Sequence, residues 1–398
     1  MAMPRWFRIL STAVTPKRLA ARHQPSGLSG AAGHCTDGID TYLQQTTALI
    51  RTVREGLGVA ADDAVIQGNS AFYLRAGGGN RATGAKAAVL MAHGLTDSPF
   101  VTRDLGAFFQ RRGFNVLSIL LPGHGTCPGD LLEVSWRDWQ QALADAVQTL
   151  ADRHETVYLC GFSLGAALAL KQALTDERVS ALFLFSPALQ LPAAAFVISA
   201  LHVLSRWIPH LRWFDVQPDD DPYKYESIPA NAIHQTWRLV QQLQRLLSLR
   251  DVQIPVFLAT SDDDASVEPA ASVDFFRRLG SRHKRLLFYS RRQPAGLPAE
   301  SRVIHSVLPE KKVISSSHMA MIVAPDNPHY GEQGQYAFCH HYYRADAEKY
   351  TRCKQFREDC LGEITLQTGP RQVLRRLTWN PWYDELLQEL DRFIDTLS

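Results

Sequence analysis

Cysteine is scarce in this sequence, with 6 among 398 residues, and no spacing among the six matches a zinc site or a disulfide framework. An excess of one charge is also lacking, because 42 Lys and Arg against 40 Asp and Glu leave a formal net charge of +2. This near balance gives no support to nucleic acid as a partner or to a strongly acidic substrate. The longest apolar run, about Leu191 to Leu204, is too short to span a bilayer. We therefore expect no transmembrane segment, no metal site and no cofactor.

The sparse cysteines favour a reducing cytoplasm as the location of the chain. A disulfide among Cys339, Cys353 and Cys360 stays open, because pairing cannot be read from sequence. The N-terminus is basic and interleaved with apolar residues, and Arg8 interrupts any core of a secretory signal. Two interpretations of this segment remain, a solvated tail and an interfacial helix that makes peripheral membrane contact.

Apolar runs of strand length recur along the chain, at Ala87 to His93, Phe114 to Leu121, Thr156 to Gly161, Val179 to Phe185 and Ile254 to Thr260. Helical segments separate the first four runs, at Phe100 to Arg112, Ser135 to Asp152 and Ser163 to Leu174. This alternation predicts an α/β fold, with a mostly parallel central sheet flanked by helices. In such a sheet the ligand binds beyond the carboxyl ends of the strands.

Departures from this rhythm suggest the organisation of the chain. We expect an N-terminal extension (1–60), a first part of the core (61–189), a helical cap insertion (190–251) and a second part of the core (252–398) with an insertion at about 323–379. Within these parts we expect a helix near Thr41 to Gly56, a strand-like stretch at Ala64 to Leu74, a further insertion at Gln293 to Lys312 and a final helix at Pro381 to Leu397.

The segment Gly161-Phe162-Ser163-Leu164-Gly165 has the pattern G-x-S-x-G between a predicted buried strand and a predicted helix. A tight turn from strand to helix leaves no room for neighbouring side chains, so glycine is needed on both sides of the serine. The serine hydroxyl then lies at a helix N-terminus, whose partial positive charge favours a developing oxyanion. Ser163 is therefore the predicted nucleophile.

The loop His93 to Pro99 follows the first core strand and can aim a backbone N–H at a substrate carbonyl. Together with the residue after the nucleophile, it predicts an oxyanion hole made by the N–H groups of Leu95 and Leu164. His93 precedes the nucleophile and is expected to brace the loop, and we expect His124 to be structural or cavity-lining.

Four motifs together resemble the bacterial carboxylesterase and monoacylglycerol lipase group of α/β-hydrolases. They are HGLTDSP (93–99), LPGHGTCPGDL (121–131), the helix start WRDW (136–139) and GFSLG (161–165). The resemblance is close over about Val89 to Leu189 and looser near Ile254 and His318. It implies an α/β-hydrolase fold in which an acid and a histidine follow the nucleophile in that chain order.

For the acid, Asp262, Asp263 and Asp264 all follow the strand at Ile254 to Thr260. Asp264 is preferred because Asp264-x-x-Val267-x-Pro269 resembles the family spacing, and its neighbours remain alternatives.

His318 is the predicted base among 14 histidines, because it follows the β-branched stretch Val313-Ile314 and resembles the family's histidine loop. His283 precedes a predicted strand and is the weaker rival, whereas His305 stays open. The sequence Cys339-His340-His341 invites a metal interpretation, but such clusters are common in exposed polar loops.

These residues predict a serine hydrolase that cleaves a small-molecule carboxylic ester through an acyl-enzyme. The resemblance and the Trp-bearing cap suggest an acylglycerol or another lipid ester, and the alternative that the apolar residues of the cap only pack it on the core stays open. Alternatives are an amide, peptide or C–C bond hydrolase on the same fold, and an inactive hydrolase-fold protein that binds a ligand.

Overall fold

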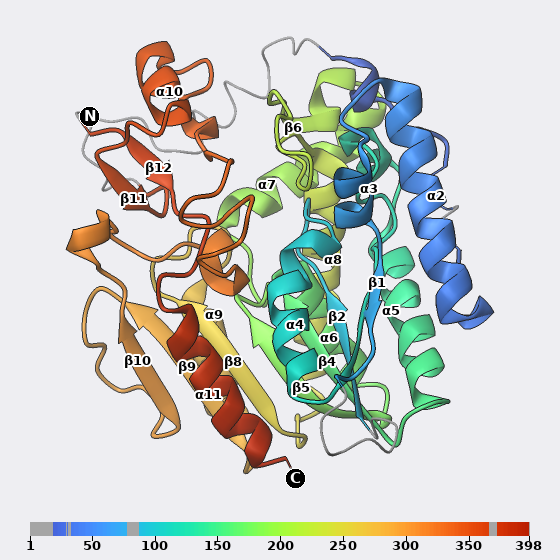
Figure 1. Cartoon of the computed structure of the whole chain (residues 1–398), viewed down its shortest axis with the longest axis vertical. Helices are drawn as coiled ribbons and strands as arrows, with labels where there is room; N and C mark the ends of the chain where they lie inside the picture. The colour runs from blue at the N-terminus through green and yellow to red at the C-terminus, as the bar shows by residue number, and fades with distance from the viewer. Residues whose placement is uncertain (1–18, 29, 31–32, 78–86, 366–371, 398) are drawn as a thin grey trace.

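The computed structural model describes residues 19–28, 30, 33–77, 87–365 and 372–397. Eight strands form one sheet in the order β1-β3-β2-β4-β5-β8-β9-β10 (Figure 1), and every neighbouring pair is parallel except β1 with β3. The predicted, mostly parallel sheet is confirmed. The strands are β1 (Phe72–Leu74), β2 (Ala87–Ala92), β3 (Asn115–Ser118), β4 (Thr156–Phe162), β5 (Val179–Phe185), β8 (Val256–Ser261), β9 (Lys284–Ser290) and β10 (Ser301–His305).

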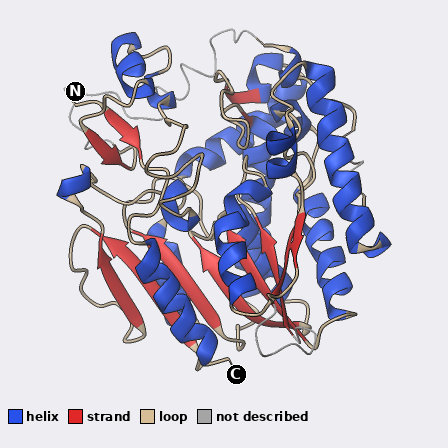
Figure 2. Ribbon diagram, in the orientation of Figure 1, coloured by secondary structure: helices blue, strands red, loops and turns tan. Residues whose placement is uncertain are grey.

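Helices cover both faces of the sheet (Figure 2) and form a separate apolar core on each face. The first core holds the buried residues of α2 (Ile39–Leu57), α5 (Trp136–Ala151), α6 (Leu164–Ala173), α8 (Ala230–Leu247) and α9 (Pro269–Arg278). The second core holds those of α4 (Arg103–Arg111) and α11 (Tyr383–Asp395). The central strands are buried from both sides, which explains why their sequences are continuous apolar runs.

Helix α5 shows how a local signal fixes an element boundary. The Ser135 hydroxyl accepts the N–H of Asp138, and the Asp138 carboxylate accepts the N–H of Ser135. This capping box satisfies donors that the first helical turn leaves free. The predicted start of this helix at Ser135 is confirmed.

Two sequence-based assignments of edge elements are wrong. The stretch Ala64 to Leu74 is mostly the helix α3 (Asp63–Asn69), with only its end in β1, because the Asp62 carboxylate accepts the Val65 N–H at 3.0 Å and caps a helix. The stretch Gln293 to Lys312 contains β10, which extends the central sheet beside β9. As an edge strand β10 is only partly buried, so it lacks the apolar run by which the central strands are recognised.

The segment between β5 and β8 contains α7 (Ala193–His202), α8 and a two-stranded sheet of β6 (Trp213–Asp215) and β7 (Ile228–Pro229), and its Tyr225 contacts the loop after β2 at the carboxyl edge of the central sheet. The N-terminal extension packs against it, because Arg22 forms an ion pair with Asp219 at 2.9 Å. No helix in the described ranges is both long and apolar enough to cross a lipid bilayer. The basic stretch from Arg5 to Arg18 lies outside the described residues.

The segment that follows His318 forms a small unit at one end of the sheet, drawn in orange to red in Figure 1, and several of its buried residues join the second core. It contains α10 (Ala347–Lys354) and the parallel pair β11 (Cys360–Gly362) and β12 (Leu374–Arg376). A disulfide joins Cys339 to Cys353, so the pairing that the sequence left open is settled in this structure. Since disulfides are rare in a reducing cytoplasm, this bond weighs against the predicted location.

Candidate active site

The G-x-S-x-G segment forms the turn between β4 and α6. Ser163 lies between the two elements with a φ of 54°, in the left-handed region that side chains rarely adopt. A Cβ atom on Gly165 would collide with the carbonyl of Ala92, and one on Gly161 would collide with the backbone of Ala166. The two glycines therefore let the helix begin directly at the sheet edge, with the serine at its N-terminus.

The three side chains predicted to carry the chemistry lie together. His318 Nε2 is 2.9 Å from Ser163 Oγ, and His318 Nδ1 is 2.6 Å from Asp264 Oδ2. A neutral imidazole with its proton on Nδ1 donates to the carboxylate and accepts the hydroxyl proton. The histidine is 8% exposed, and its ring packs 5.0 Å from the Phe162 ring. The imidazole of His318 thus lies between a hydroxyl group and a carboxylate and is hydrogen-bonded to both.

Asp264 is fixed on both carboxylate oxygens. While Oδ2 faces His318, Oδ1 accepts the backbone N–H groups of Ser266 at 2.8 Å and Val267 at 3.1 Å. Burial alone would raise the pKa of Asp264, but the electrostatic interaction and hydrogen bond with His318 and the two backbone donors together lower that pKa. The carboxylate is therefore held ionised, and its side chain cannot rotate away from the imidazole.

The two neighbouring aspartates have other partners. Asp262 accepts the Ser290 hydroxyl at 2.5 Å. Asp263 accepts the Ser306 hydroxyl at 2.9 Å and forms an ion pair with Arg291 at 2.6 Å. Neither contacts a histidine in the part of the chain that the structure describes. Asp262 links the loop after β8 to the end of β9, and Asp263 links the same loop to the residues that follow β9 and β10.

The rival histidines lie elsewhere. His283 is exposed just before β9, and His305 is exposed at the end of β10. The sequence argument for His318 was nevertheless partly wrong, because Val313 is not in the central sheet. It forms isolated bridges with Leu308 and Leu361, and the sheet strand that precedes His318 is β10.

The two predicted oxyanion donors follow the neighbouring parallel strands β2 and β4, at the same edge of the sheet. Leu164 is the first residue of α6, so its N–H has no acceptor within the helix. Leu95 lies in the turn after β2, and its N–H donates to no acceptor among the described residues. Two N–H groups left free at a helix N-terminus and a neighbouring loop can bind an oxyanion.

Contacts from the cap, which the sequence did not predict, fix the loop that carries Leu95. Lys224 forms an ion pair with Asp97, and the Tyr225 N–H donates to the Thr96 carbonyl at 2.8 Å. Thr96 has a φ of 70°, a backbone conformation that needs such support. No local signal in residues 216–227 distinguishes them from other polar loop residues, because their partners lie far away in the chain.

His93 braces the same loop as a neutral ring. Its Nδ1 lies 2.9 Å from the Gly94 carbonyl oxygen, and its Nε2 accepts the Leu121 N–H at 3.2 Å. The His124 ring packs 4.9 Å from the His93 ring, and its Nδ1 lies 3.1 Å from the Pro122 carbonyl oxygen. Burial lowers the pKa of His93 to about 4 and that of His124 to about 3. Both rings therefore stay uncharged well below neutral pH.

These two histidines predict a loss of stability in mild acid. Between about pH 6.5 and pH 5 the unfolded chain binds protons that the folded chain excludes, so the free energy of unfolding falls as pH falls, by up to about 1.4 kcal/mol per pH unit for each ring. Denaturant unfolding at several pH values should show this slope. His124→Gln should reduce the slope by one ring's share. An unchanged slope in His124→Gln would contradict the prediction.

The three residues Cys339, His340 and His341 make contacts that stabilise the fold. Cys339 is in the disulfide, His340 pairs with Glu226 at 2.6 Å and a ring nitrogen of His341 lies 3.0 Å from the Leu374 carbonyl oxygen. Within the described ranges no group of three or more His, Cys, Asp or Glu side chains could hold a metal ion.

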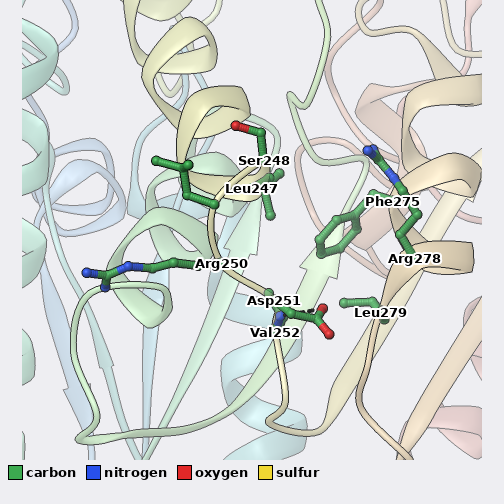
Figure 3. A pocket seen from close by; sticks show the side chains of 9 residues that line it. Leu247, Ser248, Arg250, Asp251, Val252, Phe275, Arg278 and Leu279 are labelled. Atoms are coloured by element: carbon green, nitrogen blue, oxygen red, sulfur yellow. Dashed lines mark hydrogen bonds between the residues drawn. The ribbon is translucent and has the colours of Figure 1, made fainter.

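A surface hollow of about 310 Å³ lies between the last turns of α8 and α9 (Figure 3). Its lining includes Leu247, Val252 and Leu279 and none of the predicted site residues. Val252 precedes β8, so this hollow is at the amino edge of the sheet, away from Ser163. It contributes nothing to the candidate site.

A family model described as serine aminopeptidase, S33, matches residues 83–292, which is more than half of the chain. The chain belongs to this hydrolase family. A curated relative, the thermostable monoacylglycerol lipase of Bacillus sp. (strain H-257), is 26% identical over 223 residues, which cover 56% of this chain and 85% of the relative. The predicted resemblance to the lipase and esterase group of α/β-hydrolases is confirmed, and the family supports ester hydrolysis as the chemistry of this member.

Two solved structures to which this chain is similar are those of a lipolytic enzyme and a monoacylglycerol lipase. A metagenome-derived lipolytic enzyme is 23% identical with a TM-score of 0.46, and the match covers 56% of this chain and 87% of the other. The monoacylglycerol lipase of Paleococcus ferrophilus is 21% identical with a TM-score of 0.44, and the match covers 55% and 88% of the two chains. The family match includes Ser163 and Asp264 but ends before His318.

Proposed function

We propose that the chain is a carboxylic ester hydrolase in which Ser163, His318 and Asp264 act as nucleophile, base and orienting acid. The observation that carries this proposal is the unbroken line of hydrogen bonds from the Ser163 hydroxyl through both ring nitrogens of His318 to Asp264. Removing the hydroxyl proton requires a base at this distance, and the base requires a partner that fixes its tautomer.

The reaction proceeds by acyl transfer. His318 Nε2 takes the hydroxyl proton as Ser163 Oγ bonds to the ester carbonyl carbon. The oxyanion that forms accepts hydrogen bonds from the Leu95 and Leu164 N–H groups. The imidazolium then gives its proton to the leaving alkoxide oxygen as the C–O bond breaks. Water attacks the acyl-enzyme in the same way, releases the acid and restores the Ser163 hydroxyl.

For the substrate we propose an ester with an apolar acyl group. The support is a surface on α7 and the turn after it, where several large apolar side chains are exposed to solvent. Phe196, for example, is 59% exposed. A cluster of this kind marks a surface that meets apolar material, whereas scattered exposed apolar residues are ordinary. The exposed members are Phe196, Val197, Val203, Leu204, Trp207 and Ile208.

Hydrolysis of p-nitrophenyl esters of increasing acyl length tests this proposal. Each buried methylene contributes about 0.8 kcal/mol, so kcat/KM should rise by up to about fourfold per carbon while the chain still enters the site. A flat profile or an acetate optimum would contradict the apolar acyl group. Faster hydrolysis of the matched p-nitroanilides would contradict ester cleavage itself and favour an amide substrate.

The location and the membrane contact of the chain are separate matters. The cytoplasmic location and the peripheral contact through the basic N-terminus stay predictions. The Cys339–Cys353 bond argues for an oxidising compartment rather than a reducing one.

A further inference from the structure

The loop that carries His318 is attached to the small C-terminal unit rather than to a strand of the central sheet. The Ile314 N–H donates to the Leu361 carbonyl at 2.8 Å, and the Leu361 N–H donates to the Lys312 carbonyl at 2.9 Å, so this loop runs beside β11. The Ser317 hydroxyl, next to the histidine, donates to the Leu377 carbonyl at 2.5 Å. The position of the base is thus set by residues beyond the part of the chain that the family model matches.

A buried ion pair lies where this unit meets the histidine loop. Arg376, the last residue of β12, places Nε 2.9 Å from Glu363 Oε1 and donates from Nη2 to Glu363 Oε2 at 2.9 Å. The side chains are 13% and 1% exposed. Burial alone would lower the pKa of Arg376, but the charge and hydrogen bond of Glu363 raise it, so the guanidinium stays charged in this position.

The pair contacts both loops that hold the imidazole. Glu363 Oε2 accepts the backbone N–H of His318 at 3.0 Å. Arg376 Nη2 also donates to the Ser266 hydroxyl at 3.1 Å, and Ser266 itself donates its N–H to Asp264 Oδ1. One ion pair therefore connects the backbone of the base to the loop of its acid, over a gap of more than fifty residues in the sequence.

We propose that Glu363 and Arg376 are a positioning pair that holds His318 and Asp264 in register with Ser163. The proposal rests on the proposed function, because it assigns the pair to that same site. Neither side chain touches the reacting atoms, and both act through the two loops they join. The C-terminal unit is then a required part of the active site of this chain, and the Cys339–Cys353 bond supports it next to Phe338, whose backbone pairs with Arg376.

Loss of one partner has two consequences. Without Glu363 the His318 N–H has no acceptor and Arg376 becomes a buried charge without its counter-ion, a condition that a folded chain relieves by moving the backbone. The two ring nitrogens of His318 tolerate little displacement, because a shift of about 1 Å in a catalytic group costs on the order of 10²-fold in rate.

The experiment compares Glu363→Ala, Arg376→Met and Arg376→Lys with a matched control, Glu358→Ala. The control breaks the neighbouring Glu358–Arg375 pair, which has a 3.1 Å contact and 10% and 6% exposed side chains in the same small sheet but no contact with His318. We expect Glu363→Ala and Arg376→Met to lower kcat by on the order of 10²-fold with KM retained. Arg376→Lys should recover part of this loss, and Glu358→Ala should lower thermal stability alone.

Two readouts need no ester substrate. The rate at which a fluorophosphonate labels Ser163 reports base and nucleophile geometry, and the far-downfield proton resonance of the His318–Asp264 hydrogen bond reports the dyad. Slow labelling and a lost resonance in Glu363→Ala, beside fast labelling and a clear resonance in the wild type, support the positioning pair even if the wild type hydrolyses no ester. Wild-type labelling, resonance and kcat in folded Glu363→Ala would overturn it, as would equal losses in Glu358→Ala.

Discussion

Replacing Ser163 by alanine is expected to lower kcat for a p-nitrophenyl ester by about 10⁶-fold, which is the scale of loss when the nucleophile of such a triad is removed. In the proposed mechanism Ser163 Oγ bonds to the acyl carbon, and its hydroxyl proton is the one that His318 Nε2 takes across the 2.9 Å contact. The residual rate should come from the oxyanion donors and from binding alone. The measurement is steady-state hydrolysis, together with fluorophosphonate labelling followed by mass spectrometry of the peptide that contains residue 163.

The control for this prediction is Ser248→Ala. Ser248 is a serine at the end of α8, on the hollow of Figure 3 and away from the site. It should label and turn over like the wild type. Thermal unfolding of Ser163→Ala should remain close to that of the wild type, because the serine hydroxyl is not part of either core. Full activity in Ser163→Ala would mean that the nucleophile lies elsewhere.

The central strands and the nucleophile turn could be predicted because their signals are local. β5 spans the predicted residues Val179–Phe185. β4, the strand before Ser163, is buried on both faces, so its sequence is recognisable as an apolar run. Edge elements carry no such run. β10 is partly buried, and the segment before β1 is capped as a helix by a single aspartate, so both were assigned incorrectly from the sequence.

The base and its supports depend on contacts between residues far apart in the chain. His318 could be named only by its resemblance to a family loop, and the strand invoked for it lies outside the central sheet. Glu363 and Arg376 follow no motif, because what defines them is a pairing across the C-terminal unit that β11 and β12 create. Composition marked residues 323–379 as an excursion but could not reveal that Glu363 and Leu377 in this excursion contact the loop of His318.

Asp264→Asn should lower kcat by about 10⁴-fold, because the amide keeps the shape but no longer selects the tautomer that leaves Nε2 free to accept a proton. The neighbouring Asp263→Asn is the matched variant, since it makes the same chemical change one residue away. Asp263 contacts Ser306 and Arg291 rather than His318, so its replacement should lower the free energy of unfolding and leave kcat in the wild-type range.

Measuring kcat, KM and denaturant unfolding for both variants separates the two aspartates. KM should change little in Asp264→Asn, because Asp264 acts on the imidazole and has no contact with the acyl group in the proposed mechanism. The reverse result, an active Asp264→Asn beside a stable but inactive Asp263→Asn, would assign the acid to Asp263. Because the Ser266 N–H donates to Asp264 and not to Asp263, that result would also remove the route by which Arg376 reaches the dyad.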